Sequence, residues 1–167
     1  MKPFVDENLS QDNLSSASLG IAGKRRARKL ALQALYQWQM AATALSEIEV
    51  QFHVANNMSK VDQAYFKRLL HGIPTHLSQV EDQFKPFLDR SIEALNPIEL
   101  TALRLSTFEL LYCLEIPYRV VLDEAVALTK AFGSQDGYRY VNGVLNNLCK
   151  NLRALEISME KQASEAE

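Results

Sequence analysis

The sequence predicts an all-α protein of about seven helices packed as two helical subdomains. Between residues 23 and 155 the apolar side chains recur at three- and four-residue spacings, and no strand-like alternation persists. The motif "NPIE" marks a helix start at Asn96, because Asn caps a helix, Pro suits its first turn and Glu99 stands where a capping box has an acid. The length of 167 residues suits one domain or two small subdomains.

Each expected helix has its own apolar face and boundary signals. Ser46, Asp62 and Ser134 are expected to cap helices, and Gly133 is expected to end one. The segment after Asn96 is apolar nearly all round and predicts the central, buried helix. The expected helices span about 24–42, 46–55, 62–72, 77–87, 97–115, 118–132 and 134–152.

Two polar tails are expected outside the helical domain. Residues 1–22 are rich in Ser, Asn, Asp and Gln without periodicity, and predict a disordered tail. Residues 156–167 are polar and acidic and predict a frayed end. The helical domain is therefore expected over 23–155, with subdomains at about 23–88 and 89–155.

The composition argues against several classes of protein. No apolar run approaches the roughly 20 residues that span a bilayer, and no signal-peptide layout is present. Cys113 and Cys149 lack metal or redox spacing and indicate reduced, buried thiols in a cytoplasmic protein. The histidines are isolated from these thiols, and no nucleophile elbow, phosphate loop or dinucleotide fingerprint occurs. We therefore expect no catalytic residue, no metal site and no cofactor.

The positive charge is concentrated in one block at the start of the first expected helix. Five of the six residues from Lys24 to Lys29 are basic, so this block carries +5, whereas residues 1–23 carry −2 and residues 30–167 carry −5. Cations at a helix start oppose the helix dipole, at a cost of roughly 0.3–1 kcal/mol each. Such a single-sign block suggests an anionic partner, although a solubilising surface is the simpler alternative.

A helical wheel separates the two sides of this first helix. It places Arg25, Arg28, Lys29 and Tyr36 on the outward face, with Lys24 and Arg26 on its flanks. The opposite face carries the core residues, among them Ala27, Ala31, Leu35 and Trp38. Cations pair with phosphates and an aromatic ring stacks on an unpaired base, so the outward face is typical of single-stranded RNA binding.

The last expected helix presents a second unusual face. Asp136, Tyr140, Gly143 and Asn147 point away from its core stripe, and Gly inside a helix costs about 1 kcal/mol against Ala. Something is therefore expected to approach this face closely, either a ligand or another helix. Asp136 has two interpretations: it favours the helix dipole, and its carboxylate accepts hydrogen bonds from base edges.

Over about residues 24–150 the chain resembles the NusB family of bacterial transcription antitermination factors. The resemblance rests on "KRRARKLALQALYQWQ", on "VDQAYFKRLLHGI", and on a long segment from Leu88 to Leu148 that contains "IPYRVV" and "YVNGVL". It implies an all-α fold of two helical subdomains without enzymatic activity. It also implies binding to the boxA element of nascent RNA together with the ribosomal protein NusE, in an RNA polymerase elongation complex with other Nus factors.

The resemblance also assigns residues by position. RNA binding falls on the basic segment and aromatic of the first helix and on the start of the last helix. NusE binding falls on Glu99 and, more weakly, on Glu93. The RNA-binding residues expected from the wheel and the resemblance together are Lys24, Arg25, Arg26, Arg28, Lys29, Tyr36, Asp136, Arg139 and Tyr140.

Two alternatives stay open on the sequence. A NusB-like helical domain also occurs fused to ribosomal RNA methyltransferases, but no strand-rich segment for a cofactor follows residue 150, which excludes a complete methyltransferase and leaves a detached fragment. The second alternative is a structural homodimer in which another copy of the chain masks the basic helix. Such a homodimer is expected to dissociate when RNA binds.

Overall fold

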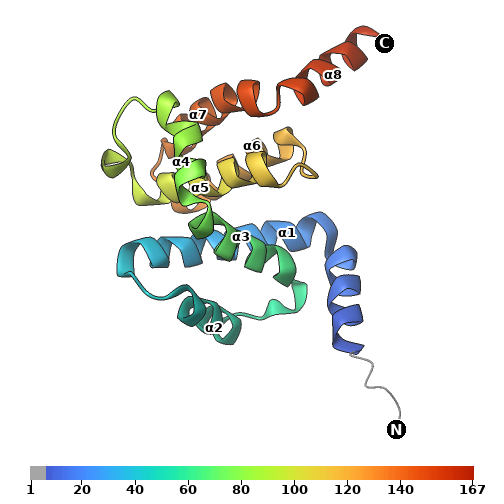
Figure 1. Ribbon diagram of the computed structural model, residues 1–167, viewed down its shortest axis with the longest axis vertical. Coiled ribbons are helices and arrows are strands. Elements are labelled where there is room, and N and C mark those ends of the chain that lie inside the picture. Colours follow the sequence, from blue (N-terminus) through green and yellow to red (C-terminus); the bar gives the residue numbers. More distant parts are fainter. Residues whose placement is uncertain (1–6) are drawn as a thin grey trace. The chain divides into compact units, whose positions relative to one another are not determined.

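The computed structural model describes the backbone of residues 7–167 and the side chains from Leu19 onward. Within that part of the chain the regular structure is entirely helical (Figure 1), which confirms the predicted all-α fold. The α-helices are α1 (Glu7–Ala41), α2 (Leu45–Ala55), α3 (Gln63–Thr75), α4 (Leu77–Phe84), α5 (Pro97–Tyr112), α6 (Tyr118–Phe132), α7 (Gly137–Leu152) and α8 (Ala154–Glu165). Three short 3-10 helices, η1 (Met58–Lys60), η2 (Lys85–Phe87) and η3 (Ile92–Ala94), join them.

The chain divides into two compact units, one ending at Gly72 and the other beginning at Ile73. The predicted boundary at 88/89 therefore lies too far along the chain. The reason is the packing of α4, which contacts α5 of the second unit and places Glu81 Oε1 2.7 Å from Arg104 Nη2. This ion pair joins positions far apart in sequence, so helical periodicity alone did not reveal it.

The first unit is built from α1, α2, η1 and α3 as far as Gly72. In Figure 1 α1 bends sharply near its first third, and Gly20 there has φ 53° and ψ −139°, a conformation that only glycine adopts readily. The structure is helical from Glu7, where the sequence predicted a disordered tail over 1–22; residues 1–6 lie outside the described part. The disorder of that tail stays a prediction.

The α3 helix starts as the sequence predicted. The buried Asp62 caps it by accepting a hydrogen bond from the Tyr65 backbone N–H at 3.1 Å. The α2 helix packs on α1, and the Phe52 ring of α2 lies 6.3 Å from the Phe66 ring of α3. Three helices therefore share one small core, and the part of α1 around Gly23 and Lys24 lies beside the start of α3.

The second unit is organised around α5. Its buried positions run all round the helix, as predicted for a central helix, and α4, α6 and α7 pack against it. Asn96 caps it by accepting hydrogen bonds from the N–H groups of Ile98 at 2.9 Å and Glu99 at 3.4 Å. Gly133 ends α6, also as predicted.

Helix α8 was not predicted, since residues 156–167 were expected to fray. The buried Arg153 holds its start by donating hydrogen bonds to the backbone carbonyls at the end of α5 and beyond, including Leu110 and Ile116 at 3.0 Å. Further along, Glu160 accepts hydrogen bonds from Tyr118 Oη at 2.7 Å and from the Arg119 guanidinium. The composition of residues 156–167 predicted a frayed polar tail, because composition does not reveal tertiary contacts such as these.

Candidate nucleic-acid interface

The basic block Lys24–Lys29 lies within α1, a few residues after the kink at Gly20, and not at the start of the helix as the sequence predicted. The block contains both exposed and buried cations. Arg25, Arg26 and Lys29 are exposed and Lys24 is partly buried. Arg28 is only 1% exposed, so its predicted outward position was wrong. Its guanidinium carbon lies 5.4 Å from the centre of the Tyr65 ring of α3, a cation–π contact inside the first unit.

One sequence signal pointed to the burial of Arg28. Leu32 follows it by one helical turn on the face that the wheel called outward, and Leu32 is fully buried. An apolar residue on that face indicates that another element covers it. The exposed cationic surface is therefore narrower than predicted.

Lys24 is fixed by the cap residue of α3. Its Nζ lies 3.2 Å from Asp62 Oδ2 and 5.5 Å from the centre of the Tyr65 ring. The backbone joins the same elements, because the Asp62 N–H donates to the Gly23 carbonyl at 3.1 Å. Lys24 and Arg28 therefore anchor this segment of α1 to α3, whereas Arg25, Arg26 and Lys29 are exposed.

Further along α1, both aromatic residues are partly exposed. Tyr36 was predicted to face outward and its side chain remains accessible. Trp38 was predicted in the core but is only half-buried. An accessible tyrosine on the helix that carries the cations retains the predicted capacity to stack on a base.

A groove opens beside the exposed cations. It has a volume of about 330 Å³ and lies between α1 and the connection from α2 to α3. Arg26 and Lys29 stand on its α1 side, and the Arg26 guanidinium also donates to the Lys60 carbonyl at 3.3 Å. The complete lining is Arg26, Lys29, Leu30, Gln33, Asn56, Asn57 and Val61.

In the second unit, the predicted residues lie at the start of α7. Asp136 is exposed at the cap position but makes no capping hydrogen bond with its side chain, and Arg139 is exposed. The Tyr140 ring is partly buried below Arg90, whose guanidinium carbon lies 4.9 Å from the ring centre. Asp89 holds that guanidinium with two hydrogen bonds of 2.7 and 3.1 Å.

These contacts shift the protonation equilibria of the group. The hydrogen bond from Arg90 holds the pKa of the Asp89 carboxyl at about 2, and partial burial raises the pKa of Tyr140. Asp89 therefore remains ionised and neutralises Arg90. Sequence reasoning missed Arg90 because it lies far from Tyr140 along the chain.

A second aromatic residue of α7, Tyr138, was also missed. Its ring lies 4.6 Å from Lys130 Nζ of α6 and 5.6 Å from the Arg139 guanidinium carbon. The Arg139 Nε–H donates to the Tyr138 hydroxyl at 3.1 Å, and this bond raises the pKa of Arg139. Tyr138 thus holds two cations beside Asp136. In the sequence, the only indication of this role is that Tyr138 directly precedes Arg139 in "YRY".

The α7 face predicted to receive a close neighbour is open. A Cβ built on Gly143 would meet no heavy atom of the described chain within 4 Å. Gly143 and Asn147 are both exposed, so no helix within the described residues packs on this face. The glycine lowers the helix propensity of α7, and no other described part of the chain approaches it closely.

The residues assigned to protein binding differ in accessibility. Glu93 is exposed on η3, whereas Glu99 is only 7% exposed. Ser134, expected to cap the last helix, instead donates its hydroxyl hydrogen bond to Glu99 Oε1. Glu99 therefore fixes the loop between α6 and α7 inside the second unit.

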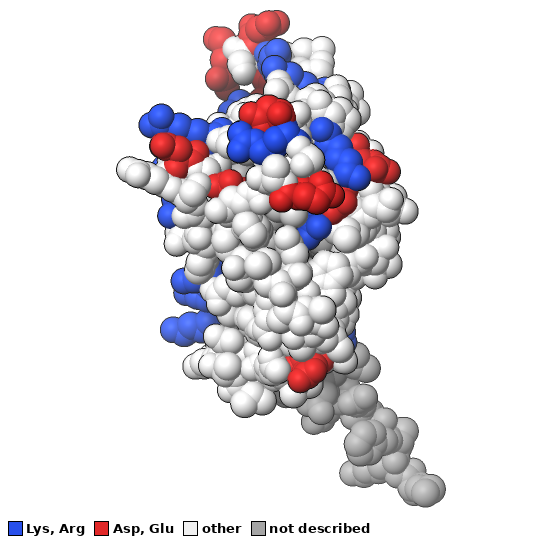
Figure 2. Space-filling model, turned by 90° about the vertical axis from the view of Figure 1, so that its left-hand side faces the viewer, with Lys and Arg blue, Asp and Glu red and all other residues white. Residues whose placement is uncertain are grey.

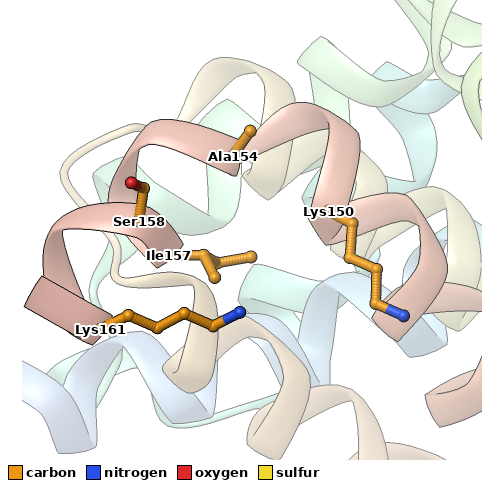
Figure 3. A pocket seen from close by; sticks show the side chains of 5 residues that line it. All are labelled: Lys150, Ala154, Ile157, Ser158 and Lys161. Carbon is orange, nitrogen blue, oxygen red and sulfur yellow. The ribbon is translucent and has the colours of Figure 1, made fainter.

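Other surface features are less specific. Figure 2 shows one face, on which basic and acidic side chains mostly stand together and large areas carry no charge. A hollow of about 290 Å³ near the α7–α8 junction holds Lys150, Ile157 and Lys161, with Ile157 pointing between the two lysines (Figure 3). Among the described residues, no cluster of His, Cys, Asp and Glu has the makings of a metal site, and no helix is long and apolar enough to cross a membrane.

Comparison with known proteins identifies the family of this chain. The model of the NusB family matches residues 25–150, which include both surfaces described above. The chain belongs to the NusB family. NusB is a family of transcription factors, and the matched range begins inside the basic block and ends near the end of α7.

Relatives match over most of their length. The transcription antitermination protein NusB of Legionella pneumophila (strain Corby) is 65% identical over 142 residues, covering 85% of this chain and 97% of the relative. NusB of Pseudomonas savastanoi pv. phaseolicola is 52% identical over 147 residues, covering 87% and 89%. The solved structure of T. maritima NusB superposes with a TM-score of 0.66 at 27% identity, covering 77% of this chain and 91% of that one.

Proposed function

We propose that this NusB-family chain is a transcription antitermination factor that binds the boxA element of nascent RNA together with NusE. The pair acts within the RNA polymerase elongation complex, with other Nus factors, and allows the polymerase to resist termination. This function places the protein in the cytoplasm. The observation that carries the RNA part is the exposed cationic surface formed by Arg25, Arg26 and Lys29 on α1.

The two RNA surfaces have different chemistry. On α1 the exposed cations contact phosphates and Tyr36 stacks on a base. On α7 the exposed Asp136 accepts hydrogen bonds from base amino groups, while Arg139, held by Tyr138, pairs with a phosphate. Lys24 and Arg28 act by fixing the basic segment of α1 against Asp62 and Tyr65.

The NusE surface is proposed around η3 and the start of α5. Glu93 offers an exposed carboxylate there. Glu99 is buried and acts by positioning the loop around Ser134. A substitution at Glu99 should therefore weaken NusE binding by displacing that loop, whereas Glu93 contacts NusE directly.

A binding experiment with both partners tests this proposal. Fluorescence anisotropy of labelled boxA RNA is measured with the chain alone, with NusE alone and with both, and a scrambled RNA of equal length is the control. We expect the chain and NusE together to bind boxA RNA at least tenfold more tightly than either alone. Equal affinity for boxA and scrambled RNA would contradict the proposed function.

A further inference from the structure

The groove beside the basic block differs from an ordinary cationic surface. Arg26 and Lys29 supply positive charge on one side, and Leu30 and Val61 supply apolar contact area. Three amide side chains, Gln33, Asn56 and Asn57, complete the lining. The volume of about 330 Å³ lies at the lower end of the range of roughly 300–1,000 Å³ found for small-ligand sites.

The local structure fixes two of these amides while leaving polar atoms for a ligand. The Asn56 Nδ2–H donates to the Phe52 carbonyl at 3.0 Å, so its side-chain oxygen remains an acceptor. The Asn57 Oδ1 accepts from the Ser59 N–H at 3.1 Å, so its amide N–H groups remain donors. Consecutive residues thus place an acceptor and a donor at one groove without further ordering.

We propose that this groove holds one base of the single-stranded RNA bound by the proposed function. Arg26 and Lys29 contact the flanking phosphates, Leu30 and Val61 contact the face of the base, and the amides hydrogen-bond with its edge. Phosphate binding alone requires only the cations. The added amides and apolar residues suit a nucleobase, which has a flat apolar face and a polar edge.

The variants that test this inference are chosen so that the fold should persist. Asn57→Ser retains an oxygen to cap η1 but removes the amide donors, and Gln33→Leu removes an amide from a partly exposed helix position. Gln37→Leu is the matched control, because Gln37 lies on the same helix and bonds Gln51 at 3.0 Å without lining the groove. Thermal unfolding of each variant confirms that the fold persists.

The RNA probes are the boxA oligonucleotide and a series in which each nucleotide in turn is abasic. In the wild-type protein, one abasic position should weaken binding about tenfold, as expected for the loss of a good amide–base pair. The variant with both Gln33→Leu and Asn57→Ser should bind intact RNA about tenfold more weakly and lose nothing further at that position. Gln37→Leu should behave as wild type.

Two results would overturn the inference while leaving the proposed function intact. In the first, the double variant binds intact RNA as tightly as wild type, although Arg25→Ala still weakens binding. In the second, every abasic RNA loses affinity by the same factor in the wild type and in the double variant. That result would mean that the groove contacts the RNA backbone and not a base. Failure of the wild-type protein to bind boxA RNA at all would instead overturn the proposed function itself.

Discussion

The Glu99 carboxylate lies so close to Gly137 that a Cβ on Gly137 would stand 1.7 Å from Glu99 Oε1. Glu99 is buried near the start of α5, and Gly137 is the first residue of α7. The hydrogen bond from Ser134 holds the carboxylate there. Gly137 is therefore required by this contact, whereas Gly143 of the same helix has an open surface.

Gly137→Ala should lower the free energy of unfolding by about 1–3 kcal/mol, because the added methyl group displaces a buried, hydrogen-bonded carboxylate. Urea denaturation gives the value. In a Glu99→Ala background the obstacle is absent, so the same substitution should cost less than about 0.5 kcal/mol. An equal cost in both backgrounds would show that the contact is not the reason for the glycine.

Gly143→Ala should have the opposite sign and raise the free energy of unfolding by about 0.5–1 kcal/mol. The new methyl group meets no atom of the described chain within 4 Å, so only helix propensity changes. The same variant should bind boxA RNA or NusE more weakly if either partner uses this face. Destabilisation in the free protein would contradict the open surface.

Arg28→Ala should destabilise the protein on the order of 2 kcal/mol, since it removes a buried side chain that covers Tyr65. Arg25→Ala, at an exposed position of the same block, should change stability by less than about 0.5 kcal/mol. Thermal unfolding compares the two variants. Equal stability of both would show that Arg28 does not anchor α1.

The attachment of α8 should depend on pH through Glu160. The hydrogen bond from Tyr118, followed in size by the one from Arg119, lowers the pKa of Glu160 below its ordinary value of 4.5. Because the folded pKa is lowered, the stabilisation is present above pH 4.5 and is lost as the pH falls through the lowered value. In that pH range the helical secondary chemical shifts of residues 157–165, measured by NMR, should decrease toward random-coil values.

Glu160→Gln should produce the same weakening at pH 6, because a neutral amide cannot form the charged pair with Arg119. Lys161→Gln is the control, as its neighbouring side chain takes no part in these bonds. If the shifts of α8 in Glu160→Gln match those of the wild type at pH 6, Glu160 does not hold the helix.

The sequence predicted features that depend on neighbours along the chain. The cap at Asn96, the cap at Asp62 and the end of α6 at Gly133 all involve contacts within a few residues. The all-round apolar pattern of α5 likewise required a central position. Local rules of this kind were sufficient to predict the fold class.

Features that depend on distant residues were predicted less well. A wheel describes one isolated helix, so it placed Arg28 outward although Tyr65 of α3 covers it. The Glu160 carboxylate orders α8 through residues about forty positions away. Arg90 and Tyr140 meet across a similar separation. These contacts form only after the helices pack, and they decide which polar residues remain exposed.

The salt dependence of RNA binding tests the central claim, that the exposed cations of α1 contact RNA phosphates. The affinity for boxA RNA is measured by anisotropy between low and moderate salt for wild type and for Arg25→Ala with Arg26→Ala. Lys150→Ala with Lys161→Ala removes two exposed cations elsewhere and is the control. Losing two phosphate contacts should make the log–log slope shallower by roughly 1.4, with the control unchanged. A slope in the arginine variant equal to that of wild type would contradict the claim.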